Sequence, residues 1–227
     1  MISDIELAVL YTLAVSSVGV YGILFAGWSA NSAYAFLGAL RSTAQIISYE
    51  LLLSSAVLTV VILAGSFNII TIIESQQSIW YVVPLFTIFV IFLVSALAEL
   101  NRTPFDLPEA ESELVSGYNT EHSSIPFVFF FLAEYASIVL ISTLTAIFFL
   151  GGYAIPEIFF NDTFINISSI VLSLKTSIIA FFIVWVRATL PRVRFDQLLT
   201  LCWTMILPSA IALVLLVPSI LVAFDAV

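Results

Sequence analysis

The chain has 227 residues, of which 62% are hydrophobic and 9% are charged. A soluble domain is roughly half apolar and a quarter charged, so this composition excludes a protein whose surface faces mainly water. The net charge of −9 also excludes a basic nucleic-acid-binding protein, and we expect no nucleic-acid partner. The single cysteine, Cys202, cannot form an internal disulfide, and we expect no metal site.

Long apolar runs predict an all-α fold, a polytopic bundle of about six helices that spans a lipid bilayer. The first run is uncharged, the second contains Glu50, and the third ends at Glu99. The fourth contains Glu134 and the fifth contains Lys175. The predicted spans form a single transmembrane domain and cover residues 7–27, 42–67, 79–99, 124–151, 165–190 and 198–223, with an acidic loop at residues 100–123.

Basic residues near the ends of the spans predict the orientation. The loops around Arg41, Arg102 and Arg187 to Arg194 fall on one side and hold five of the six basic residues. Six spans place both termini on the other side. By the positive-inside rule the arginine-bearing loops face the cytoplasm or the mitochondrial matrix.

Three ionisable residues are expected at one depth in the membrane. Counted from the arginine side, Glu50, Glu134 and Lys175 lie about 13–18 Å deep, near the middle of the hydrocarbon layer. One interpretation is a structural ion pair or a polar clamp between helices. The other, which we favour, is a path for protons or ions, because charge at this depth is costly and usually functional.

The acidic loop is the second candidate. Six carboxylates lie from Glu99 to Glu121, and Asp106, Glu109 and Glu113 would share one face of a short helix. Clustered carboxylates repel one another, which favours proton exchange near neutral pH. Acids that merely face water near a helix start are the alternative. The loop joins two spans, so Glu99, Glu109, Glu111 and Glu113 form a predicted ladder that leads towards Glu134.

A basic segment, PRVRFDQ, follows the fifth span. Its charged residues, together with the preceding Arg187, are Arg192, Arg194 and Asp196. They either fix the topology or dock an acidic partner surface or a polar head group.

Three stretches resemble a known family. ALAELNRTPFDLPEAESELVSGYNTEHSSIPF followed by FFLAEYASI, GWSANSAYAFLGALRSTAQIISYE, and IVWVRATLPRVRFDQLLTLCW are similar to chain 1 of respiratory NADH–ubiquinone oxidoreductase. The resemblance covers nearly the whole chain. It implies a membrane subunit that helps to form the ubiquinone chamber and the start of an acidic proton path.

The resemblance also assigns roles to residues. The proton path would use Glu50, Glu99, Glu109, Glu111, Glu113, Glu134 and Lys175. The quinone chamber or its supporting loops would use Arg41, Arg102, Asp106, Arg187, Arg192, Arg194 and Asp196. The chain itself would bind no cofactor, and ubiquinone would be a substrate of the whole complex.

The family has about eight spans, and the first two have no counterpart in this sequence. The resemblance therefore implies a split chain 1 in the mitochondrial inner membrane, or alternatively a bacterial plasma membrane, partnered by other complex subunits and by a separate polypeptide with two spans. Two rivals are a proton- or sodium-coupled secondary transporter and a scaffold membrane protein. A transporter is expected to show an internal repeat and broken helices, and neither is clear here.

Overall fold

The computed structural model describes residues 5–106, 122–154 and 168–223, and within these ranges the regular structure is entirely helical. The prediction of an all-α bundle is confirmed. The helices are α1 (Ala8–Ser29), α2 (Ala33–Ala64), α3 (Ile69–Glu74), α4 (Phe86–Glu99), α6 (Ser124–Phe149), α7 (Ser168–Thr189), α8 (Phe195–Leu201) and α9 (Leu207–Ala223), with a π-helical turn, η3 (Cys202–Ile206), between the last two.

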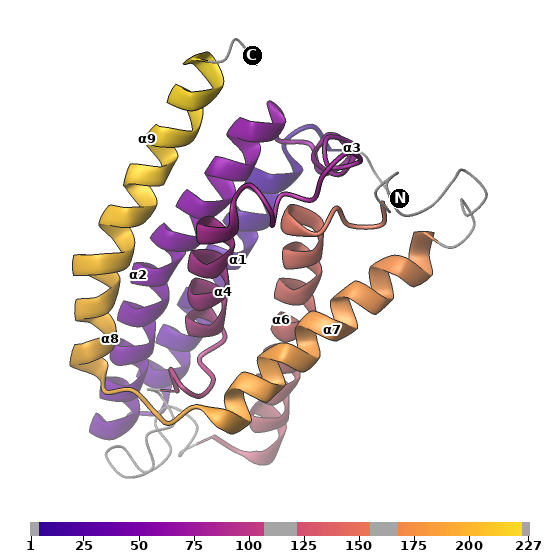
Figure 1. Ribbon diagram of the computed structural model, residues 1–227. Coiled ribbons are helices and arrows are strands. Elements are labelled where there is room, and N and C mark those ends of the chain that lie inside the picture. Colours follow the sequence, from indigo (N-terminus) through magenta and orange to yellow (C-terminus); the bar gives the residue numbers. More distant parts are fainter. Residues whose placement is uncertain (1–4, 107–121, 155–167, 224–227) are drawn as a thin grey trace.

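Helix α2 is the centre of the bundle. It packs against α1, α4 and α9, while α6 packs against α7 on the other side of α4 (Figure 1). Its residues Ala56, Val57 and Val60 are almost fully buried and join the main hydrophobic core with Phe92 of α4 and Phe149 of α6. The core therefore lies between α2, α4 and α6.

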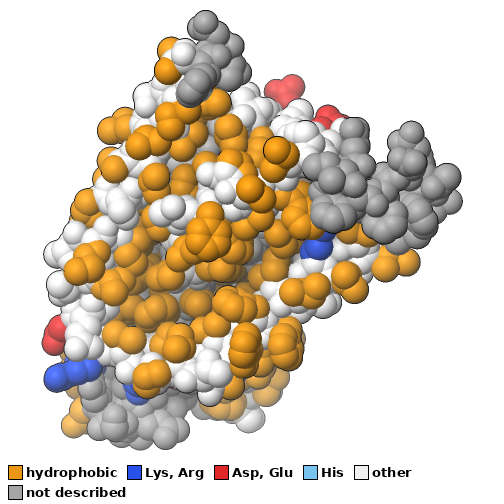
Figure 2. All heavy atoms as spheres, viewed as in Figure 1, with side chains coloured by type: hydrophobic (Ala, Val, Ile, Leu, Met, Phe, Trp, Pro, Cys, Tyr) orange, Lys and Arg blue, Asp and Glu red, His pale blue; other side chains and the backbone are white. Residues whose placement is uncertain are grey.

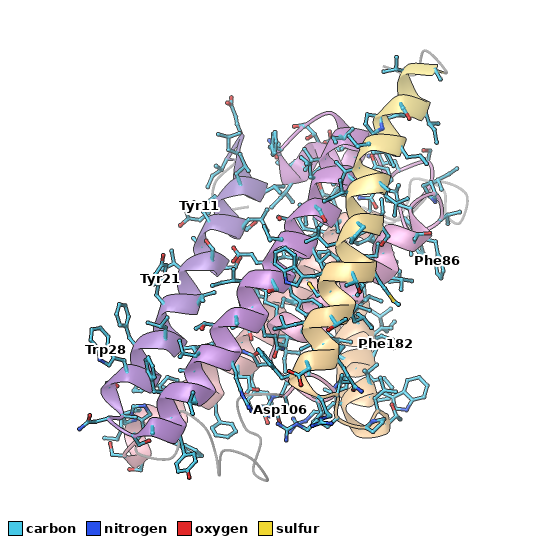
Figure 3. The ribbon with its side chains drawn as sticks, turned by 90° about the vertical axis from the view of Figure 1, so that its left-hand side faces the viewer. Tyr11, Tyr21, Trp28, Phe86, Asp106 and Phe182 are labelled. Carbon is cyan, nitrogen blue, oxygen red and sulfur yellow. The ribbon has the colours of Figure 1, made fainter. Side chains whose placement is uncertain are left out.

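Within the described residues, five helical segments are long and apolar enough to cross a membrane, and α4 is a shorter apolar helix. They are Ala8–Ser29, Ala33–Ala64, Ser124–Phe149, Ser169–Thr189 and the continuous run Phe195–Ala223. Their outward side chains are apolar: Figure 2 shows a broad hydrophobic face with charged side chains near its edges. Along α1, Tyr11, Tyr21 and Trp28 point away from the bundle and are more than half exposed (Figure 3). Such a surface suits lipid or apolar helices of a partner, not water.

Helix α2 begins earlier than the predicted span at residues 42–67. Ser32 caps it, because its Oγ accepts a hydrogen bond from the N–H of Ala35 at 3.2 Å. Arg41 consequently lies within the helix and not in a loop, which corrects the sequence prediction. It is half-buried, and its guanidinium lies 5.8 Å from the centre of the Phe195 ring.

Helix α4 begins later than the predicted span at residues 79–99. The preceding segment contains Pro84, which has no N–H to donate to a helix. In this segment the Val82 N–H donates instead to the Phe149 carbonyl at 3.0 Å, and Gln76 accepts from the Tyr81 N–H. A helix of 14 residues is about 21 Å long, so α4 is shorter than the hydrocarbon layer, and the irregular segment is sustained by contacts within the protein.

The two ends of the bundle differ in charge. The start of α1 and the end of α9 lie at one end, and Asp106 with the α7–α8 connection lies at the other (Figures 1 and 3). We call the second the arginine end and define it by residues 100–106 and 187–196. Arg102, Arg187, Arg192 and Arg194 all belong to it. The charge asymmetry expected from the sequence is therefore present in the fold.

Gly27 allows α1 to approach α2 closely. A Cβ atom added there would overlap the Ala39 side chain and lie 3.0 Å from the Ala35 carbonyl oxygen, whereas one added at Gly22 of the same helix meets nothing within 4 Å. We predict that Gly27→Ala lowers the stability by about 1–3 kcal/mol through overpacking. Gly22→Ala is the matched control and should leave stability unchanged or slightly higher. Thermal unfolding of the purified protein measures both, and equal melting temperatures would contradict the close approach.

Candidate functional site

A turn at residues 100–106 follows α4 and brings several of the predicted site residues together at the arginine end. Asn101 adopts a left-handed conformation with φ of +49°, which is uncommon for a residue other than glycine. Its Nδ2 donates to the Ser42 hydroxyl of α2 at 3.2 Å. The Phe105 N–H donates to the Arg102 carbonyl at 2.8 Å and closes the turn. The chain is therefore folded back tightly just after Glu99.

The turn buries Arg102 inside the protein. This side chain is 5% exposed and forms a salt bridge with Glu134 of α6, which is 20% exposed. The guanidinium also lies 5.9 Å from the ring centre of Phe131 and 5.6 Å from that of Tyr135. A buried cation needs such a carboxylate and such ring faces, because water does not solvate it there. Arg102 is the residue that holds Glu134 in place.

Glu50 and Glu99 form a second carboxylate group. Glu50 lies on α2 and Glu99 is the last residue of α4, two helices that pack against each other. Both are half-buried. The packing of α2 against α4 thus places two of the predicted acids on neighbouring helices.

The basic segment after α7 is tied to the same turn. Thr103 donates its hydroxyl to the Arg187 carbonyl at 3.2 Å, and the Val193 N–H donates to the Pro104 carbonyl at 3.0 Å. The charged side chains of the segment are exposed, namely Arg187, Arg192, Arg194 and Asp196. The structure thus brings this segment beside Arg102 and the half-buried Asp106, with its charges turned outward.

Lys175 lies elsewhere, which corrects the prediction of a layer shared with Glu50 and Glu134. Its Nζ donates to the carbonyls of Leu150, Gly152 and Ala154 at 2.7, 2.9 and 2.8 Å. It also lies 4.9 Å from the centre of the Trp80 ring. These carbonyls follow the end of α6, roughly 24 Å along that helix from Glu134. Helix α7 crosses the bundle obliquely (Figure 1). The hydrogen bonds of Lys175 place its ammonium beyond the end of α6 that lies away from the arginine end.

Other predicted residues cannot be placed. Glu109, Glu111 and Glu113, and the short helix expected for them, lie outside the described residues. Among the residues that the structure does describe, no group of three or more His, Cys, Asp or Glu side chains is arranged to hold a metal ion.

Sequence reasoning missed two buried glutamines. Gln45 and Gln76 are fully buried, and each donates its amide to two backbone carbonyls. The sequence signal for them is an uncharged polar side chain within or beside an apolar run. This signal is weaker than that of a charged residue in the same place.

Comparison with known proteins decides the family. A family model described as NADH dehydrogenase matches residues 1–218. NADH-ubiquinone oxidoreductase chain 1 of Mycosarcoma maydis is 68% identical over 226 residues, which are 99% of this chain and 68% of that protein. The chain belongs to the NADH dehydrogenase family.

Further members show how widely the similarity extends. NADH-ubiquinone oxidoreductase chain 1 of Trichophyton rubrum is 55% identical over 237 residues, covering 99% of this chain and 69% of that protein. An NADH-quinone oxidoreductase subunit of the bacterium Rhodospirillum rubrum is 51% identical over 226 residues, covering 99% of this chain and 67% of that protein. These members of the NADH dehydrogenase family are subunits of an oxidoreductase complex. The resemblance read from the sequence is confirmed.

The pairing of Glu134 with Arg102 can be tested by substitution. Glu134→Gln should leave Arg102 buried without a full counter-charge and destabilise the protein by about 3–5 kcal/mol. Joint replacement by Arg102→Met and Glu134→Leu removes both charges and should recover most of that loss. The measurement is the amount and melting temperature of the assembled protein. A double variant that is less stable than Glu134→Gln alone would contradict the pairing.

The corrected place of Lys175 predicts an independent effect. Lys175→Met leaves three carbonyls without their donor and should lower stability by several kcal/mol, at about 1–3 kcal/mol for each unsatisfied group. Leu174→Met, at the exposed neighbouring position, is the control and should have little effect. The losses from Lys175→Met and Glu134→Gln should add within about 0.5 kcal/mol in the double variant. A coupling energy well above about 0.5 kcal/mol would instead support the pairing of Glu134 with Lys175 that was expected from the sequence.

Proposed function

We propose that this chain is a core membrane subunit of a proton-translocating NADH:ubiquinone oxidoreductase, and that it forms part of the ubiquinone chamber and the start of the proton path. The observation that carries the proposal is 68% identity, over nearly the whole chain, to a protein named chain 1 of that enzyme. Relatives with this name come from Mycosarcoma maydis, Trichophyton rubrum and Chondrus crispus, among others. We place the chain in the mitochondrial inner membrane, with the arginine end towards the matrix.

The chemistry of the proposed reaction requires protons at a buried site. Reduction of a quinone to a quinol takes up two electrons and two protons. The electrons come from NADH through other subunits, since the role we assign to this chain needs no redox group. The protons must come through protein groups, because a hydrocarbon layer does not carry them. Carboxyl groups at graded depth are suited to this task.

The proposed path begins outside the described residues, at Glu109, Glu111 and Glu113 of the acidic loop. It continues through Glu99 and Glu50, which lie on the packed helices α4 and α2. Glu134 is the third acid, and its charge is balanced by Arg102. We leave Lys175 out of the path, because its ammonium is bound to backbone carbonyls at the other end of α6.

The proposed quinone contacts lie at the arginine end. Arg102 and Asp106 belong to the turn beside the path, and a quinone carbonyl accepts hydrogen bonds from a guanidinium such as that of Arg102. The exposed Arg187, Arg192, Arg194 and Asp196 are proposed to support the chamber by contacting other subunits of the complex. Arg41 is proposed to hold α8 through Phe195.

The proposal predicts a specific set of partners. A tagged form of this chain, extracted in mild detergent, should copurify with subunits that carry flavin and iron–sulfur clusters and with NADH–ubiquinone reductase activity. After reconstitution into vesicles, NADH oxidation should acidify one side. Recovery of the chain without NADH-oxidising partners would overturn the proposal. Ion transport by the chain alone, independent of NADH, would favour the secondary transporter.

The same purification tests the split-chain prediction. A separate two-span polypeptide should appear in the native mass of the complex. Its absence would contradict that part and leave the oxidoreductase role intact.

A further inference from the structure

Gln45 is a buried polar residue to which the proposed function gives no role. It lies on α2, one turn before Tyr49, and its side chain is fully buried. Its Nε2 donates to the Ala98 carbonyl at 2.8 Å and to the Phe105 carbonyl at 3.0 Å. One amide therefore joins α2 to two points on the chain that follows α4.

These two points enclose the residues of the candidate site. Ala98 directly precedes Glu99, Phe105 directly precedes Asp106, and Arg102 lies between them. A change in the separation of the two carbonyls would move the backbone of Glu99 relative to Glu50 and the backbone of Arg102 relative to Glu134. Gln45 is thus placed to set the geometry of Glu99 with Glu50 and of Arg102 with Glu134. It does so without contacting either partner of the Arg102–Glu134 salt bridge.

The turn needs these hydrogen bonds because its backbone conformation is intrinsically unfavourable. Asn101 has a positive φ, a conformation that residues with a side chain adopt rarely. The carbonyls at the end of α4 lack partners from a following helical turn, and water is excluded there. Ser42, which precedes Gln45 by one turn on the same face of α2, accepts from Asn101. Two side chains of α2 therefore hold the turn.

Only the amide nitrogen of the Gln45 side chain, Nε2, takes part in these two hydrogen bonds. Its Oε1 is buried and has no hydrogen-bond partner in the part of the chain that the structure describes. A hydroxyl has one proton to give and a methionine has none, whereas a glutamine amide gives two. A glutamine side chain has both the two N–H donors and the length that are needed to bond the Ala98 and Phe105 carbonyls.

We propose that Gln45 is a positioning residue for proton transfer. By bonding both carbonyls it keeps Glu99 beside Glu50 and Arg102 against Glu134, so that the carboxyl groups stay at the separations that transfer needs. The inference rests on the proposed function of the chain.

Gln76 supplies a matched control at the opposite end of the bundle. It is equally buried, and its Nε2 donates to the Ile72 and Ile147 carbonyls at 3.1 and 3.0 Å. Its Oε1 accepts from the Gly151 N–H at 2.9 Å. Gln76 has the same chemistry and burial, and it contacts no residue of the candidate site.

The experiment compares Gln45→Met with Gln76→Met in the assembled complex. Both substitutions keep volume and remove two donated bonds, so both should lower the melting temperature. Gln45→Met should in addition reduce NADH–ubiquinone turnover per assembled complex about tenfold or more, since a misplacement of an ångström suffices for such a loss. Its pH profile of turnover should shift relative to the unaltered complex. Gln76→Met should keep turnover within about twofold and leave the profile unchanged. Other links from the turn, through Thr103 and Val193, should allow Gln45→Met to assemble.

Two further measurements separate the outcomes. Reduction of an artificial acceptor that takes electrons directly from the flavin should be the same in both variants, because it needs no proton path. Gln45→Asn keeps the amide but is one carbon shorter, and it should behave like Gln45→Met. If the unaltered complex has no NADH–ubiquinone activity, the proposed function fails. If it is active and the two methionine variants match in turnover and pH profile, Gln45 is structural only and the inference is overturned.

Discussion

The burial of Arg102 is the constraint on which the arginine end depends. A guanidinium that is 5% exposed in a membrane bundle must find its counter-charge and its donors' partners within the protein. Glu134 of α6 provides the charge, and Phe131 and Tyr135 provide ring faces. Because Arg102 sits in a turn after α4, this one cation joins α4 to α6. The other links of the turn reach α2 and the α7–α8 segment, so four parts of the chain meet around a single charge.

The two buried cations of this protein are stabilised in different ways, and the difference matters for function. Lys175 is bound by three backbone carbonyls, which cannot change their charge. Arg102 is bound by a carboxylate, whose protonation would remove the attraction. A proton arriving at Glu134 therefore alters the forces on the 100–106 turn, whereas no titration of its acceptors can release Lys175.

The sequence is sufficient to predict the bundle, the end that carries arginines, and the acids Glu50, Glu99 and Glu134, because apolar runs and rare charges are local features. It fails where contacts depend on the path of the chain. Depth counting placed Lys175 beside Glu134, but α7 is oblique and the long lysine side chain reaches past the end of α6. Arg102 was counted as a loop residue, although the turn at Asn101 carries it back into the bundle. The bonds of Gln45 to residues 53 and 60 positions away have no local sequence signal at all.

These contrasts suggest how the bundle divides its work. At the end opposite to the arginine end, Gln76 and Lys175 bind main-chain groups around the end of α6, and Gly151 accepts the positive φ that this turn requires. The acceptors at that end are neutral main-chain groups, whose charge does not change with pH. At the arginine end the same kind of amide, Gln45, holds a turn that is also restrained by the salt bridge between Arg102 and Glu134. Neutral hydrogen bonds at the end of α6 and an ion pair nearer its start therefore restrain the same helix in chemically different ways.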